Sequence, residues 1–351
     1  MPILKTVNVE LTGICCALPQ NAKSIYEIGD GYFSKDEIEK ATHSVGVKEL
    51  FVAEKDQTAA DFCYAAAEKL IETLKWEKDT IDGLLFVSQT PDYKMPATSC
   101  VLHGRLGLKS DCIALDINLG CSGFVHGLFL ASQFIQSGAC KRILVMTGDT
   151  LRRHISPQDK GISFIISDGG AATAVEYSKH PTPMTFIMKT DGNGYEDLII
   201  EAGGERLHCS EETKQLYEDK DGSKRSKENF YMNGMNVFTF AIKQVPNVLN
   251  QILEEHPWNR ADVDLFLLHQ ANSYMVKYIA KRAKIDENKI PINIGKFGNT
   301  NGSTIPFLIC DLKDKWQNRK NVVLAGFGIG LSWGAVACEL EKLECAEIIR
   351  I

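Results

Sequence analysis

The chain has 351 residues, and its 39 Lys and Arg against 45 Asp and Glu give a formal net charge of -6 at pH 7. Hydrophobic residues make up 44% of the chain and charged residues 24%, a balance typical of a soluble globular protein with a large core. The acidic surplus argues against nucleic acid as a partner, because proteins that bind phosphate backbones usually carry a basic surplus.

The apolar runs and the cysteines indicate the cellular compartment. No run approaches the roughly 18 apolar residues of a membrane span, and no segment of signal-peptide form follows the start of the chain. Eleven cysteines are scattered from Cys15 to Cys345 and form neither a CxxC pair nor a cluster with zinc spacing. We therefore expect a cytoplasmic protein with free thiols, no membrane partner and no metal site.

Short apolar runs alternate with longer helical patterns along the chain. This alternation predicts an α/β fold with largely parallel sheets. Buried strands are expected at 82–90, 112–120, 142–150, 265–272 and 321–330, and helices at 58–76, 124–138, 237–255 and 273–285.

An internal repeat runs through these elements. Residues 84–89 resemble residues 265–270, and residues 143–148 resemble residues 323–328, with an offset of about 180 residues in both cases. A constant offset for elements in the same order indicates duplication, so we predict two similar α/β halves in one compact unit. Each copy also contains a Gly-rich turn, at 118–127 and at 297–306.

The repeat suggests three parts of the chain. Residues 1–180 are expected to form the first half, residues 231–351 the second half, and residues 181–230 the connection between them. Within the connection, residues 203–229 are dense in charge and lack an apolar period, which favours a solvated, partly mobile loop. A lid over a substrate entrance is the functional alternative for this loop.

Cys121 lies in the first Gly-rich turn, after a predicted strand and at the start of a predicted helix. The positive end of a helix dipole favours a thiolate, and the unpaired N–H groups of the first turn can hold an oxyanion. The sequence therefore suggests a nucleophile at Cys121. A buried cysteine in a packed corner between strand and helix is the simpler alternative.

His269 and Asn299 occupy comparable positions in the second half. His269 ends a predicted strand, where α/β folds often build sites, and Asn299 lies in the second Gly-rich turn. Each residue alone has a structural explanation, because a buried His is common and Asn often stabilises a turn. The repeat predicts that Cys121, His269 and Asn299 converge where the two halves meet.

These residues stand in motifs that resemble the β-ketoacyl-acyl-carrier-protein synthase III family of the thiolase-like superfamily. The resemblance implies a five-layered αβαβα fold of two duplicated halves, usually in a homodimer. The motifs are DINLGCSGF (116–124), ISDGGAATAV (166–175), MNGMNVF (232–238), LLHQAN (267–272), GNTNGSTIP (298–306) and GFGIGLSWG (326–334).

The resemblance implies a decarboxylating condensation. Cys121 would take an acyl group from a thioester, and His269 and Asn299 would stabilise the enolate that forms when a malonyl-carrier-protein thioester loses carbon dioxide. The backbone N–H groups of Cys121 and Ile329 would form the oxyanion hole. Two alternatives are transfer of the acyl group to an oxygen or nitrogen nucleophile, and a non-catalytic partner subunit, against which the intact Cys121 argues.

The resemblance also implies the partners. Acyl-CoA and acyl-carrier-protein thioesters would be substrates, with no permanently bound cofactor. A stripe of lysines at positions i, i+4 and i+7 of the predicted helix 273–285 would bind the acyl carrier protein. An ordinary solvated face is the alternative for this stripe. The implied substrate-binding residues are Met95, Arg153, Gly234, Phe238 and Asn272, with Met95 reaching across the dimer, and the stripe consists of Lys277, Lys281 and Lys284.

The sequence departs from the family at four positions. Lys40 and Ser44 stand where the housekeeping members have a Trp and an Arg that clamp the CoA adenine. Ile329 replaces a usual Gly, and Tyr274 replaces a usual basic residue after the HQAN motif. Because stacking on the adenine is lost, we expect that acetyl-CoA is not the preferred acyl donor.

Overall fold

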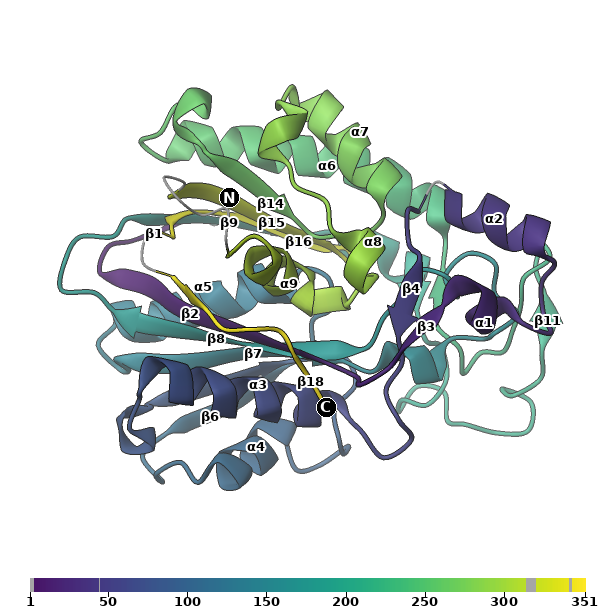
Figure 1. Ribbon diagram of the computed structural model, residues 1–351, viewed down its shortest axis with the longest axis horizontal. Coiled ribbons are helices and arrows are strands. Elements are labelled where there is room, and N and C mark those ends of the chain that lie inside the picture. The colour runs from purple at the N-terminus through teal and green to yellow at the C-terminus, as the bar shows by residue number, and fades with distance from the viewer. Residues whose placement is uncertain (1–2, 44, 314–319, 341–342) are drawn as a thin grey trace.

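The computed structural model describes residues 3–43, 45–313, 320–340 and 343–351. Two β-sheets are stacked with helices between them and on both outer faces, which gives five layers (Figure 1). The first sheet has the order β17-β2-β8-β7-β5-β6, with β18 also paired to β2. Its strands are β2 (Val9–Leu18), β5 (Gly83–Val87), β6 (Ile113–Ile117), β7 (Arg142–Asp149), β8 (Gly169–Tyr177), β17 (Glu344–Cys345) and β18 (Ile349–Arg350).

The second sheet has the order β1-β9-β16-β15-β14. Helices α3 and α4 cover the outer face of the first sheet, α5 and α9 lie between the sheets, and α6 and α7 cover the second sheet (Figure 1). The strands are β1 (Ile3–Thr6), β9 (Met184–Thr190), β14 (Leu265–Leu268), β15 (Asn321–Gly328) and β16 (Ser332–Glu339), and the helices are α3 (Ala59–Leu74), α4 (Thr98–Leu106), α5 (Gly123–Gln136), α6 (Gly234–Glu255), α7 (Ser273–Ala283) and α9 (Thr304–Asp311).

The strand order confirms the duplication. In the first half β5 runs parallel to β7, and β8 is antiparallel to both β7 and β2. In the second half β14, β15, β16 and β9 have the same order and the same relative directions. The repeated segments identified in the sequence are β5 and β7 in one copy and β14 and β15 in the other.

The expectation of largely parallel sheets is wrong, because both sheets are mixed. β7 is followed along the chain by its antiparallel neighbour β8, and β15 by its antiparallel neighbour β16. Sequence analysis assigned no strand to β8 or β16, whose buried sequences GGAATAVEY and SWGAVACE are rich in Gly and Ala. Small residues have a low β-propensity, so these two strands lack the residue pattern from which a strand is usually predicted.

The chain termini cross between the two sheets. β1 pairs with β9 at the edge of the second sheet, whereas β17 and β18 near the other terminus pair with β2 of the first sheet. The boundaries at residues 180 and 230 remain predictions, and no pattern in the sequence indicates this exchange.

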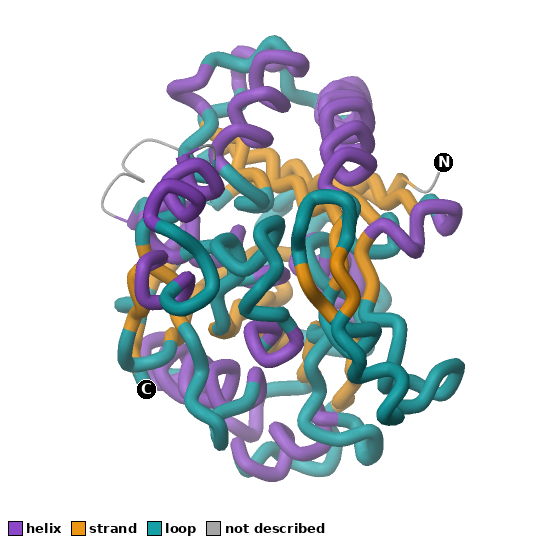
Figure 2. The backbone as a smooth tube through the Cα atoms, turned by 90° about the vertical axis from the view of Figure 1, so that its right-hand side faces the viewer, coloured by secondary structure: helices purple, strands orange, loops and turns teal. Residues whose placement is uncertain are grey.

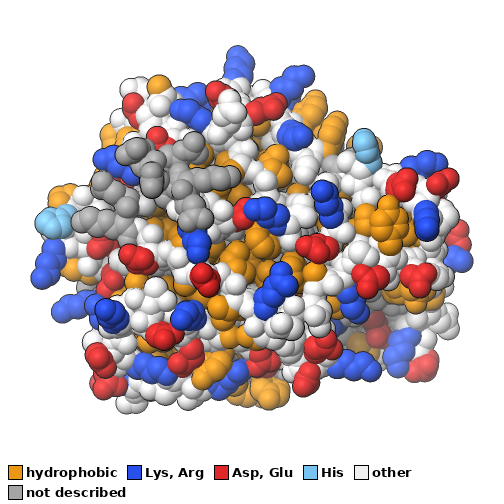
Figure 3. All heavy atoms as spheres, viewed as in Figure 1, with side chains coloured by type: hydrophobic (Ala, Val, Ile, Leu, Met, Phe, Trp, Pro, Cys, Tyr) orange, Lys and Arg blue, Asp and Glu red, His pale blue; other side chains and the backbone are white. Residues whose placement is uncertain are grey.

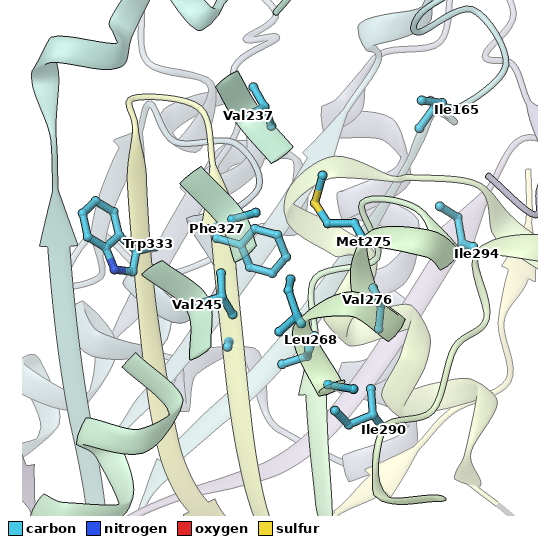
Figure 4. Close-up of a cluster of buried hydrophobic side chains, with 14 of the residues drawn as sticks. Ile165, Val237, Val245, Leu268, Met275, Val276, Ile290, Ile294, Phe327 and Trp333 are labelled. Atoms are coloured by element: carbon cyan, nitrogen blue, oxygen red, sulfur yellow. The ribbon is translucent and has the colours of Figure 1, made fainter. Parts of the chain in front are cut away.

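The helices over the second sheet enclose an apolar core. Figure 4 shows Val245 of α6, Leu268 of β14, Phe327 of β15 and Val276 of α7 directed toward one another. All four side chains are almost completely buried. This packing fixes the end of β14, so the next residue, His269, has a rigid support.

The charged loop 203–229 is anchored by a buried cation. The Arg225 side chain is only 4% exposed, and its guanidinium donates hydrogen bonds to Asp159 and Asp219. The same guanidinium lies 4.8 Å from the ring centroid of Tyr231. The loop is therefore not wholly solvated. A pattern of apolar residues cannot indicate this anchor, because the buried group is a charged guanidinium that pairs with carboxylates.

Loops and short strand pairs cover the side of the molecule seen in Figure 2. Acidic and basic side chains are intermingled on the face drawn in Figure 3. No helix among the described residues is long and apolar enough to cross a membrane. The remaining elements are β3 (Ala22–Ser24), α1 (Ile25–Gly29), α2 (Lys35–His43), β4 (Glu49–Phe51), β10 (Leu198–Ile199), β11 (Tyr217–Glu218), β12 (Lys224–Arg225), β13 (Tyr231–Met232) and α8 (Ile294–Phe297).

Candidate active site

Cys121 lies in the tight turn between β6 and α5, two residues before the helix begins at Gly123. The end of β15 passes over this turn so closely that a Cβ atom on Gly328 would lie 2.7 Å from the Cβ of Cys121. Gly328 also has a φ of 153°, which side-chain-bearing residues rarely adopt. The contact between the two halves at the thiol therefore requires a glycine.

The protonation of Cys121 differs from the sequence-based expectation. Burial, with a smaller contribution from the charge of Asp149, raises the pKa of the Cys121 thiol to about 12. Hydrogen bonds from the backbone N–H groups of Ile329 and Cys121 act in the opposite direction but are weaker. The expectation of a thiolate is thus wrong, because desolvation outweighs the helix N-terminus and leaves Cys121 a thiol at neutral pH.

His269 is a neutral, fixed imidazole at the end of β14. Its backbone N–H donates to the carbonyl oxygen of Ala325 at 2.9 Å, and its Nδ1 lies 2.7 Å from the hydroxyl of Thr304. The ring packs edge-on against Phe327 with 5.4 Å between centroids. Burial lowers the pKa of His269 to about 3, so the ring is uncharged at neutral pH and its Nε2 is the nitrogen left for a ligand.

Asn299 is held in a defined orientation by its own turn. The Oδ1 atom of Asn299 accepts a hydrogen bond of 2.9 Å from the backbone N–H of Asn301. The backbone N–H of Asn299 donates to the carbonyl oxygen of Ile165 at 2.8 Å. Because its Oδ1 is occupied, the side chain presents its Nδ2 hydrogens as donors.

One cavity of about 350 Å³ joins the residues singled out in the sequence. Its walls are mainly apolar with a few polar groups among them, a lining typical of sites for small molecules. The predicted residues on its surface are Cys121, Gly234, Phe238, His269, Asn272, Asn299 and Ile329, and the apolar residues that sequence analysis did not identify include Leu151, Ile162, Ile165, Leu198, Phe230, Met232 and Met235.

Two predicted substrate-binding residues do not line this cavity. Met95 is 83% exposed, at the tip of the segment that follows β5. The Arg153 guanidinium donates hydrogen bonds to the backbone carbonyls of Glu54 and Gln57. Arg153 therefore does not line the cavity of this chain, whereas Met95 was expected to reach the cavity of a partner chain, and that expectation stays a prediction.

The predicted basic stripe is only partly helical. Lys277 and Lys281 are exposed on α7, whereas Lys284 follows the end of the helix in a left-handed conformation with a φ of 53°. Lys284 is therefore exposed but does not continue the helical face of the other two. At the start of α7, the ring of Tyr274 stacks on Phe238 of α6 at a centroid distance of 5.7 Å.

Lys40 and Ser44 occupy the positions at which the resemblance implies an adenine clamp. Lys40 is an exposed residue of α2 and does not line the cavity, and Ser44 lies outside the described residues. Among the residues that the structure describes, no group of three or more His, Cys, Asp and Glu side chains is arranged to hold a metal ion.

Asn301 is a site residue that sequence analysis did not identify. Its Oδ1 accepts a hydrogen bond from the Cys121 thiol at 3.0 Å, and its Nδ2 donates to buried Asp149 at 2.7 Å. The only signal in the sequence was a second Asn in the same Gly-rich turn as Asn299. A turn motif cannot reveal a contact with a residue 180 positions away.

Two duplicated sheets with Cys, His and Asn side chains on one cavity define a thiolase-like condensing acyltransferase. Family models described as 3-oxoacyl-[acyl-carrier-protein (ACP)] synthase III and as its C-terminal part match residues 115–192 and 253–340. A β-ketoacyl-[acyl-carrier-protein] synthase III of Clostridioides difficile is 32% identical over 292 residues, which are 83% of this chain and 86% of the relative. The chain belongs to the 3-oxoacyl-[acyl-carrier-protein] synthase III family.

Solved structures agree with this assignment. A 3-oxoacyl-(acyl-carrier protein) synthase from Burkholderia xenovorans superposes with a TM-score of 0.93 and 35% identity, covering 100% of this chain and 99% of that one. The priming β-ketosynthase of the R1128 polyketide pathway, at 22% identity and a TM-score of 0.80, shares the fold.

Proposed function

We propose that the protein forms an acyl-Cys121 intermediate and condenses it with a malonyl-carrier-protein thioester to give a β-ketoacyl product, with loss of carbon dioxide. The observation that supports this proposal is the cavity on which Cys121, His269 and Asn299 all lie. The Cys121 thiol lies on a largely apolar cavity. The pantetheine arm of a bound thioester would exclude water from this cavity, which favours attack by the thiol.

In the acylation step, the Cys121 sulfur attacks the thioester carbonyl and loses its proton. The N–H groups of Cys121 and Ile329, which already face the sulfur, stabilise the oxyanion of the tetrahedral intermediate. The bond from the acyl carbon to the donor sulfur then breaks, and the leaving thiolate takes up the proton. The acyl group stays on Cys121.

In the condensation step, His269 and Asn299 act on the malonyl thioester. When the bond to the carboxylate breaks, its electron pair moves toward the thioester oxygen, where negative charge develops. A neutral His269 stabilises that oxygen when its Nε2 bears the hydrogen, the tautomer in which Nδ1 is the acceptor toward the Thr304 hydroxyl 2.7 Å away. The Nδ2 of Asn299 is the second donor. The resulting carbon nucleophile attacks the acyl carbonyl carbon, the bond from that carbon to the Cys121 sulfur breaks, and the thiolate released takes up a proton from water.

A panel of thioesters tests this function. We expect incubation with acyl-CoA and acyl-carrier thioesters of different chain length to increase the intact mass by one acyl group, with acetyl-CoA not the most efficient donor. Addition of malonyl-carrier protein should then release one carbon dioxide for each β-ketoacyl product. Loss of the acyl group to an oxygen or nitrogen nucleophile without carbon dioxide release would contradict decarboxylative condensation.

We propose acyl carrier protein as a partner that docks on Lys277 and Lys281, with Lys284 at the margin. Lys277 and Lys281 project from α7, and the N-terminal end of this helix reaches the cavity through Asn272, Tyr274 and Met275. An acidic carrier protein on this face would lie close enough to insert its pantetheine arm.

We also propose a homodimer in which the partner's copy of the Met95 segment shapes the acyl pocket. β6 ends the first sheet, and its Leu115 is 44% exposed, as is expected of an edge that another chain covers. Light scattering should give about twice the 39.0 kDa chain mass. Leu115→Lys should shift the protein to the monomer mass, whereas Leu216→Lys on the charged loop should not. A fully active wild-type monomer would contradict the proposal.

A further inference from the structure

Asn301 contacts the thiol through its side-chain oxygen. The Cys121 thiol donates to Oδ1 of Asn301 over 3.0 Å. The two residues are also held close by the backbone, because a Cβ atom on Gly120 would lie 3.0 Å from the Oδ1 of Asn301. A fixed acceptor at this distance favours the protonated form of the sulfur.

Asp149 determines which end of the Asn301 amide faces Cys121. Oδ2 of Asp149 accepts a hydrogen bond of 2.7 Å from Nδ2 of Asn301. Its Oδ1 accepts from the backbone N–H of Gln89 at 2.7 Å and from the hydroxyls of Ser88 and Thr90 at 3.2 and 3.3 Å. Because an ionised carboxylate only accepts, the charged form of Asp149 favours the orientation in which the amide nitrogen faces Asp149 and the amide oxygen faces the sulfur.

The backbone of Asn301 reaches the other two proposed catalytic residues. Its N–H donates to Oδ1 of Asn299, and its carbonyl oxygen lies 3.2 Å from the Thr304 hydroxyl that contacts His269. The φ of Asn301 is 52°, in the left-handed region that Asn tolerates better than most residues other than Gly. One residue therefore connects the three groups.

We propose that Asn301, anchored by Asp149, is a positioning residue that keeps Cys121 a thiol in the resting protein. The inference deepens the proposed function, since it concerns the same nucleophile. The thiol is protected from small electrophiles, and its proton is released only when a thioester occupies the oxyanion hole.

The charges around Cys121 also favour the protonated thiol. Titratable groups near Cys121 and Asp149 include His269 on the same cavity, His126 on α5 and the buried thiol of Cys63. Burial lowers the pKa of both histidines, so neither supplies a positive charge that would favour a thiolate. Burial raises the pKa of Cys63 well above its usual range and that of Asp149 to about 7, so Asp149 is the group that becomes charged as the pH rises through neutrality.

The test is the rate of Cys121 alkylation by iodoacetamide, followed by peptide mapping across pH. Asn301→Gly removes the side chain but keeps the left-handed backbone, and Asp149→Asn removes the charge. Each should move the alkylation profile of Cys121 to lower pH. A fall of about one pKa unit raises the thiolate fraction roughly tenfold, and the accompanying loss of nucleophilicity leaves a rate increase of about threefold near neutral pH.

The controls separate this effect from loosening of the fold. Asn8→Gly is a matched change, because Asn8 also has a positive φ and its side chain donates to the backbone of Ser178, away from the cavity. Exposed Cys209 is an internal reference within each sample. A threefold increase confined to Cys121 in either folded variant supports the proposal. An unchanged or slower rate at Cys121, an equal increase at Cys209, or the same increase in Asn8→Gly overturns it.

Acylation of the wild-type chain distinguishes failure of this inference from failure of the proposed function. If no thioester acylates Cys121 but the selective increase is seen, the function is wrong and the role of Asn301 stands. If acylation proceeds and the increase is absent, the role of Asn301 is wrong and the function stands.

Discussion

Replacement of Cys121 by Ala is expected to abolish acyl transfer, since no acyl-enzyme can form without the sulfur. The other ten cysteines cannot substitute, because none of them lines the cavity. The measurement is intact mass after incubation with the best acyl thioester, followed by peptide mapping of the wild-type adduct. We expect one added acyl group in the wild-type chain, on Cys121, and none in Cys121→Ala.

The matched control for this prediction is Cys209→Ala, which removes an exposed thiol on the charged loop. This variant should retain both acylation and condensation. An acyl group found on Cys112 or Cys140, with Cys121 unmodified, would contradict the assigned nucleophile.

His269→Ala and Asn299→Ala are expected to separate the two half-reactions. Both variants should still acquire the acyl group on Cys121, because the oxyanion hole of that step is formed by backbone N–H groups. Each should lose condensation by about 10²–10³-fold, the usual cost of removing one donor that stabilises developing negative charge. The measurements are acyl-enzyme formation by mass and carbon dioxide release from malonyl-carrier protein.

His256→Asn is the control for removing a buried histidine. His256 is also almost completely buried, and its Nδ1 contacts Thr185 at 2.7 Å, but it does not line the cavity. We expect this variant to retain decarboxylation if it remains folded. The assigned roles would be wrong if His269→Ala and Asn299→Ala kept their fold but failed to acylate.

The sequence predicts the elements of the fold better than the directions of its strands. The repeated apolar segments locate β5, β7, β14 and β15 correctly because buried parallel strands are continuous hydrophobic runs. The antiparallel strands β8 and β16 are missed because their packing depends on small residues that have no characteristic period. Strand direction is decided by contacts distant in sequence.

The same distinction holds for the candidate site. Cys121, His269 and Asn299 lie at the ends of elements with clear patterns, so their meeting on one cavity follows from the repeat. The roles of Asn301 and Asp149 depend on side-chain hydrogen bonds between the two halves, which no local pattern contains. Whether the thiol is ionised depends on burial, which only the assembled fold provides.

The crossing of the termini has a mechanical consequence. β1 ties the beginning of the chain to the second sheet, and β17 and β18 tie its end to the first, so each half is clasped by a strand from the opposite end of the polypeptide. The short connection from β1 to β2 therefore links the second sheet directly to the first. The thiol, imidazole and amide therefore lie on a frame that is tied together at both ends of the chain, which favours a constant distance between them.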